Sequence, residues 1–186
     1  MKDEELMWKT DSVSTILETP VFSVQKKRQS SAAGPCGDYY SVQGRCCVIV
    51  LAVYEGRFVM VRQWRHGSEE ITREFPGGVV DDGECVEKAA ARELEEETGF
   101  RSERITRLGT VNPNPALFSN RFHVFLAEEL TPVGGLHTDE DEFLNVTEVP
   151  ISEVIGTYGT GEFLHAFMGT ALAFYMRYRL SEKGTV

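Results

Sequence analysis

The sequence has few cysteines, and none stands in a spacing that binds zinc or exchanges disulfides. The four are Cys36, Cys46, Cys47 and Cys85, with no C-x-x-C pair among them. Cys46 and Cys47 are adjacent, so in a strand their side chains would point to opposite faces. We therefore expect reduced thiols in a cytoplasmic protein.

Long hydrophobic runs are also missing. The most apolar stretch, residues 163–176, is too short for a membrane span and contains His165 and Thr170. We expect a packed helix there and no association with a membrane. Residues 1–5 are acidic rather than basic and no apolar segment follows them, so we expect no signal peptide.

An excess of positive charge is absent as well. Against 29 Asp and Glu residues the chain has 19 Lys and Arg, which gives a formal net charge of -10. Because proteins that bind nucleic acid present a basic face, we expect no nucleic-acid partner. A phosphate-bearing substrate remains compatible with this charge, since a metal ion can bridge two sets of negative groups. The length of 186 residues predicts one domain, or one domain with a small appendage.

The most informative stretch is a glycine turn, residues 78–84, followed by a helix rich in carboxylates. At 3.6 residues per turn, Glu93, Glu96 and Glu97 continue the apolar stripe of this helix instead of its wet face. Like charges on a partly buried face repel each other and lose hydration, so they need a compensating cation. Hard carboxylate oxygens without nearby His or Cys favour Mg²⁺ or Mn²⁺ over zinc.

A solvated acidic helix is the alternative interpretation of such a run. The spacing argues against it, because the stretch resembles the Nudix box, G-x5-E-x7-R-E-U-x-E-E-x-G-U, where U is a bulky aliphatic residue. The matching positions are Gly78, Glu84, Arg92, Glu93, Leu94, Glu96, Glu97 and Gly99. Phe100 departs from the pattern, which prefers Ile, Leu or Val there. It is still large and apolar, so its packing role is kept.

The remaining pattern predicts a mixed α/β domain over residues 44–186, preceded by an antiparallel β appendage over 1–43. Within the appendage, residues 20–25 and 38–42 have strand character. This pair either packs against a partner subunit or extends the main sheet. The strands expected in the main domain are 46–53, 57–64, 107–111, 121–127 and 146–149, and its later helices are 150–157 and 161–180.

Three further features predict parts of a site. Arg65, at the end of the strand 57–64, is placed to hold a diphosphate, because a guanidinium binds oxyanions in bidentate fashion. Arg62 is a second candidate, and a plain surface role is the alternative for both. The adjacent glycines before the box leave the Gly77 carbonyl available as a metal ligand. The acidic loop 134–144 either is simply solvated or supplies a carboxylate that activates water.

Beyond the box, most of the chain resembles the ADP-ribose pyrophosphatase branch of the Nudix hydrolases. The resemblance rests on Trp8-Lys9-Thr10, on the Gln-x-Arg that ends in Arg65, and on Pro115 beyond the box. It implies an α/β/α sandwich around a mixed sheet. It also implies a homodimer that exchanges its N-terminal strands.

The same resemblance implies the roles of the site residues. Mg²⁺ ions, or Mn²⁺ in their place, would be held by Glu93, Glu96, Glu97 and the Gly77 carbonyl. The catalytic base would be Glu140, with Glu142 as the second choice. Arg65 would contact the substrate diphosphate, and Arg62 and Phe118 are further candidates for substrate binding.

The function that we expect is metal-dependent hydrolysis of a nucleoside diphosphate sugar of the ADP-ribose type. The products would be a nucleoside monophosphate and a sugar phosphate. One alternative is a Nudix hydrolase acting on nucleoside triphosphates or dinucleotides. The other is a binding module without activity, which we expect to lack the metal carboxylates that this chain retains.

Overall fold

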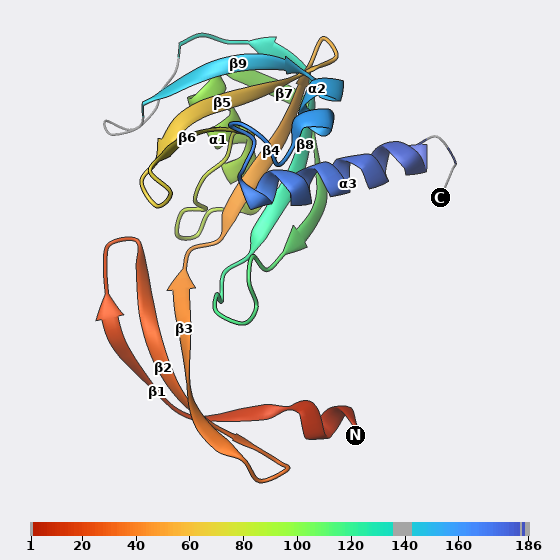
Figure 1. Ribbon diagram of the computed structural model, residues 1–186. Coiled ribbons are helices and arrows are strands. Elements are labelled where there is room, and N and C mark those ends of the chain that lie inside the picture. The colour runs from red at the N-terminus through yellow and green to blue at the C-terminus, as the bar shows by residue number, and fades with distance from the viewer. Residues whose placement is uncertain (1, 136–142, 183, 185–186) are drawn as a thin grey trace. The chain divides into compact units, whose positions relative to one another are not determined.

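The computed structural model describes residues 2–135, 143–182 and 184 (Figure 1). The chain folds into two compact units. The first contains Met1–Cys46 and Asn112–Arg121, and the second contains Cys47–Val111 and Phe122–Val186.

The first unit is a three-stranded antiparallel sheet in the order β1-β2-β3. Its strands are β1 (Trp8–Glu18), β2 (Phe22–Ser31) and β3 (Cys36–Gly44), and a 3₁₀ turn, Asp3–Leu6, precedes them. The segment 112–121 joins this unit through the end of β3, because the Val42 N–H donates to the Leu117 carbonyl at 2.8 Å and the Ser119 N–H donates to the Val42 carbonyl at 3.1 Å.

The sequence predicted two strands in the appendage, and the structure has three. The strand that the sequence analysis did not predict is β1, whose residues WKTDSVSTILE alternate only in part between polar and apolar side chains. Every residue of β1 is exposed. A strand with no buried face has no reason to show a period of two, so pattern analysis does not detect it.

The second unit contains a six-stranded mixed sheet in the order β6-β5-β4-β8-β7, with β9 also pairing with β5. Its strands are β4 (Cys47–Tyr54), β5 (Arg57–Arg65), β6 (Glu70–Glu74), β7 (Phe100–Val111), β8 (Phe122–Pro132) and β9 (Leu144–Pro150). β4 and β8 run parallel, and the other pairs are antiparallel. The central strand β4 is therefore flanked by sheet on both sides and buried.

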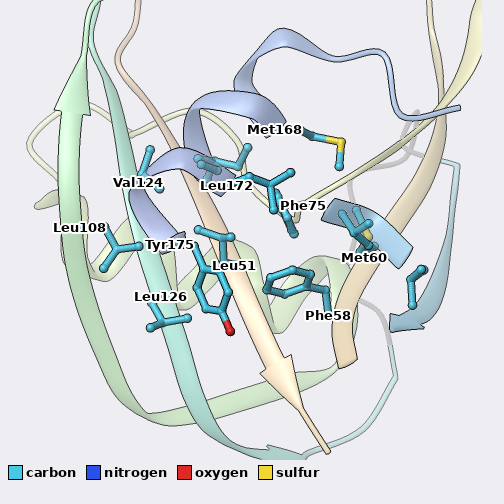
Figure 2. Close-up of a cluster of buried hydrophobic side chains, with 14 of the residues drawn as sticks. Leu51, Phe58, Met60, Phe75, Leu108, Val124, Leu126, Met168, Leu172 and Tyr175 are labelled. Atoms are coloured by element: carbon cyan, nitrogen blue, oxygen red, sulfur yellow. The ribbon is translucent and has the colours of Figure 1, made fainter. Parts of the chain in front are cut away.

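Alternate residues of β4 pack into two separate hydrophobic layers, one on each face of the sheet. Val48 and Val50 pack with Leu94 of the helix α1 (Val86–Thr98). Ile49 and Leu51 belong to the layer packed by the helix α3 (Ala166–Glu182). Figure 2 shows this second layer, whose aromatic rings meet edge to face. Helices on both faces of the sheet give the α/β/α sandwich that the sequence predicted.

The helices begin and end for local reasons. α1 ends at Gly99, whose φ of 69° is left-handed and whose N–H donates to the Glu95 carbonyl. The short helix α2 (Ile151–Thr157) follows β9 directly. The last helix begins at Ala166, not near Gly161 as predicted, because both Gly159 and Gly161 have positive φ. None of the helices in the described part of the chain is long and apolar enough to cross a membrane.

Candidate active site

The acidic face of α1 contacts the glycine turn that precedes it. The Gly77 N–H donates to the Glu97 carboxylate at 2.8 Å, and Glu97 is only 3% exposed. A Cβ atom on Gly78 would lie 2.6 Å from a carboxylate oxygen of Glu93. Gly78 therefore lets the backbone approach Glu93 more closely than any other residue allows, whereas Gly77, whose added Cβ would collide with the Val48 carbonyl, lets the turn lie against β4.

The turn also pairs with β4, which fixes the direction of its carbonyls. The Val50 N–H donates to the Pro76 carbonyl at 2.8 Å, and the Val48 N–H donates to the Gly78 carbonyl at 2.9 Å. Successive carbonyls of an extended segment point in opposite directions. The carbonyl of Gly77, between these two, is thus turned away from β4. This orientation agrees with the ligand role predicted for it.

Arg92 forms hydrogen bonds with three carboxylates of the box. It donates to both oxygens of Glu84, to Glu93 at 2.9 Å and to Glu96 at 3.0 Å. Its Nη2 also donates to the Val79 carbonyl. The hydrogen bond to Glu84 is the largest cause of the raised pKa of Arg92, and it lowers the pKa of Glu84 in return. Arg92 and Glu84 therefore remain a charged pair at neutral pH.

The donor set of this cluster fits a hard divalent cation. The groups available are carboxylate oxygens and one backbone carbonyl, with no thiolate or imidazole among the residues that the sequence analysis selected. In the described residues, no three acidic, histidine or cysteine side chains already converge as a metal cage. Glu93 and Glu96 instead form hydrogen bonds with Arg92. To bind a metal ion, these side chains would have to give up part of their contact with the guanidinium.

A pocket of about 330 Å³ opens beside the glycine turn. Its lining includes Gly77 and Gly78 from the turn, Arg65 at the end of β5, and His165 and Phe167 around the start of α3. This volume is at the lower limit of the roughly 300–1,000 Å³ that is typical of ligand sites.

Glu74, at the end of β6, holds the arginine of this pocket. Its carboxylate is 2% exposed and accepts hydrogen bonds from Arg65 Nε at 2.8 Å and Nη2 at 2.6 Å. Thr72 Oγ1 donates to the same carboxylate, and His165 Nδ1 lies 2.8 Å from Oε2. Burial alone would raise the pKa of Glu74, but the hydrogen bonds from Arg65 and the close contact with His165 outweigh it and hold this pKa far below its ordinary range.

The other predicted site residues lie in different surroundings. Arg62 forms a bidentate ion pair with Glu162, with distances from 2.6 to 2.9 Å. Phe118 belongs to the first unit, where its carbonyl accepts a hydrogen bond from Asn112. Glu140 and Glu142 lie outside the described residues. Their roles, like those of the metal-binding residues, stay predictions.

Sequence analysis did not select Glu74, His165 or Phe167. Glu74 carries a weak signal, since it is a charged residue at the end of a strand, directly before the apolar Phe75. His165 carries none, because it comes from a distant part of the chain and its partner is known only from the fold. Phe167 stacks on Phe122 with ring centroids 3.6 Å apart, another contact between distant segments.

The fold and the site together define a sandwich protein with a carboxylate-rich helix beside a small pocket that contains an arginine. Residues 44–167 match the NUDIX domain family, which is well over half of the chain. The chain belongs to this family, as the sequence predicted. Nudix hydrolases generally need a divalent metal ion.

Several relatives and solved structures resemble the chain. An ADP-ribose pyrophosphatase of Bacillus subtilis is 41% identical over 110 residues, which covers 58% of this chain and 60% of that protein. The ADP compounds hydrolase NudE of Escherichia coli is 28% identical over 177 residues, 94% of each chain. A crystal structure of an ADP compounds hydrolase matches with a TM-score of 0.83 and 26% identity over 96% of this chain and 97% of that one. This match confirms the predicted fold class.

Proposed function

We propose that the protein hydrolyses the diphosphate of an ADP-ribose-type nucleoside diphosphate sugar. The products are a nucleoside monophosphate and a sugar phosphate. The names of the relatives support this substrate class, since they include an ADP-ribose pyrophosphatase and an ADP compounds hydrolase.

One observation carries the proposal. The glycine turn contacts the carboxylates of α1 on one side and lines the pocket that contains Arg65 on the other. A diphosphate next to this turn would meet metal-binding oxygens and a guanidinium at once. Arg65 suits this task because its planar fork binds phosphate oxygens in pairs.

The metal that we propose is Mg²⁺, with Mn²⁺ as a substitute, held by Glu93, Glu96, Glu97 and the Gly77 carbonyl. When bound, such an ion neutralises charge that develops on the phosphoryl oxygens. Arg92 orients Glu93 and Glu96 through its hydrogen bonds, and Arg65 orients the diphosphate. A water oxygen forms a new bond to one phosphorus while the bond from that phosphorus to the bridging oxygen breaks.

The base that removes the proton from this water is proposed to be Glu140, with Glu142 as the second candidate. Both assignments rest on the resemblance to the family. Glu140→Gln should then preserve metal binding and sharply reduce turnover, whereas near-normal turnover would move the role to another residue.

The function is tested with a substrate panel in the presence of Mg²⁺, with products separated by chromatography. The panel contains ADP-ribose, GDP-mannose, UDP-glucose, a dinucleotide and nucleoside triphosphates. Cleavage of a sugar diphosphate into a monophosphate and a sugar phosphate supports the proposal. Hydrolysis of triphosphates alone would keep the metal site and overturn the substrate class. Tight binding without metal-dependent turnover would indicate a binding module.

We also propose that the protein is a homodimer, assembled in the cytoplasm through its N-terminal strands. β1 is an edge strand with exposed apolar side chains, among them Val13, Ile16 and Leu17. An exposed edge of this kind pairs readily with another strand. Residues 1–46 hold six basic and six acidic residues, so the net charge of -10 resides in residues 47–186. Two copies of the neutral strands can therefore meet without charge repulsion.

A further inference from the structure

The loop 158–165, which precedes α3, contacts β5 and β6 through a hydrogen bond and two ion pairs. The Arg73 N–H donates to the Glu162 carbonyl at 2.9 Å, and the Glu162 carboxylate pairs with both Arg62 and Arg73. The Arg73 guanidinium also lies 5.5 Å from the centre of the Phe163 ring. These contacts hold the loop against β5 and β6, so that its last residue, His165, is presented to Glu74.

His165 is itself held on its other side. Its ring packs edge-on against Phe167, with centroids 4.9 Å apart. Its Nδ1 atom is buried and makes no hydrogen bond of regular geometry within the described residues, but it lies in ion-pair contact, 2.8 Å from Oε2 of Glu74. The same oxygen accepts the hydrogen bond from Arg65 Nη2. The imidazole of His165 and the guanidinium of Arg65 thus both contact Oε2 of Glu74.

This arrangement controls how the guanidinium faces the pocket. Glu74 engages Arg65 through both Nε and Nη2, which fixes the plane of the guanidinium. The carboxylate can set that plane only if its own rotation is restrained. Thr72 restrains Oε1 and His165 restrains Oε2. Such outer contacts commonly decide how well a binding group is aligned.

We propose that His165 is a positioning residue for the reaction, which acts through Glu74 to hold Arg65 in the orientation that binds the diphosphate. The inference rests on the proposed function, because it assigns the diphosphate to Arg65. It adds a residue from the C-terminal part of the chain that need not touch the substrate itself.

A double-mutant cycle tests the proposal, with KM and kcat for ADP-ribose measured separately in the presence of Mg²⁺. His165→Ala should raise KM about tenfold, the size expected for a lost contact with a charged group. In an Arg65→Ala background the same substitution should change KM by less than about twofold, because the arginine on which it acts is gone. His165→Asn should restore most of the affinity, since its amide N–H can donate to Glu74. If the two substitutions each raise KM by their full separate factors in the double variant, so that the factors multiply, the proposal is overturned.

Two controls separate this role from a structural one and from failure of the proposed function. Leu164→Ala changes an exposed neighbour in the same loop and should leave KM unchanged, and thermal unfolding of each variant reports on the fold. If the wild-type protein binds ADP-ribose without cleaving it, the proposed function fails. The same double-mutant cycle is then carried out with Kd values for ADP-ribose measured by calorimetry. These values still test whether His165 acts through Arg65. A protein that neither binds nor cleaves it overturns both.

Discussion

The Glu97 carboxylate accepts a hydrogen bond from the Gly77 N–H at 2.8 Å, which joins the acidic helix to the turn before it. One oxygen of a buried carboxylate is thereby fixed by the backbone. The peptide unit of the turn is fixed in return, together with the direction of the Gly77 carbonyl. This hydrogen bond thus joins the helix to the carbonyl that is predicted to bind metal before any ion arrives.

This close approach predicts a strong effect of a single methyl group. Gly78→Ala would place a Cβ atom 2.6 Å from Glu93, so the carboxylate has to move. We expect kcat/KM for the sugar diphosphate to fall about 100-fold, since small displacements at a reacting centre have effects of this size. Gly156→Ala is the matched control, because nothing lies within 4 Å of the added atom. Equal activity of the two variants would contradict the geometry.

The charge of Glu97 gives a second prediction. Glu97→Gln keeps an oxygen that accepts from Gly77 but removes a negative charge from the metal site. The Mg²⁺ concentration for half-maximal activity should rise about tenfold or more, with little change in the unfolding temperature. Glu95→Gln on the same helix, where the carboxylate pairs with Arg101 at the surface, serves as the control. An unchanged Mg²⁺ requirement in Glu97→Gln would remove this residue from the metal site.

A third prediction concerns the pH dependence of stability. The pKa of Glu74 is depressed in the folded protein, so its contribution is fully present above the ordinary carboxyl pKa of 4.5 and is lost as the pH falls toward the folded-state pKa. Glu74→Gln should therefore lower the free energy of unfolding by about 2 kcal/mol at neutral pH. The difference from wild type should shrink at about pH 3. Urea unfolding at both pH values measures this, with the exposed Glu70→Gln as the control.

The exposed edge strand gives a fourth prediction. Ile16→Glu places a charge among the apolar side chains of β1 and should convert the proposed dimer into a monomer. Light scattering coupled to size exclusion should give about twice 20.9 kDa for the wild type and a single chain mass for the variant. Ile155→Glu, a matched exposed isoleucine on α2, should remain dimeric. A monomeric wild type would reject the proposed assembly.

The sequence predicted the elements that leave a periodic or continuous pattern of apolar residues. The helix α1 was predicted after the glycine turn, because its apolar stripe is a local signal. The buried strand β4 was predicted from its continuous apolar run. The exposed strand β1 and the late start of α3 at Ala166 were not predicted, since neither the solvation of a strand nor a loop held by Glu162 leaves a periodic signal.

The site shows the same division. Glu93, Glu96 and Glu97 share one face of one helix, so helical geometry alone brings them together. The contact between Glu74 and His165 joins a strand end to a distant loop, and it depends on how β6 and α3 are placed by the whole sheet. Contacts between elements that are far apart in sequence require the tertiary fold. Those within a single element do not.

The segment 112–121 makes the first unit discontinuous along the chain, with one part before β4 and the other between β7 and β8. A gene fragment cut at Cys46 would leave the end of β3 without the carbonyl of Leu117 to which it donates. Recombination at a single crossover therefore cannot transfer this unit intact to another protein. We expect the N-terminal strands and the 112–121 loop to be inherited together and to change together during evolution.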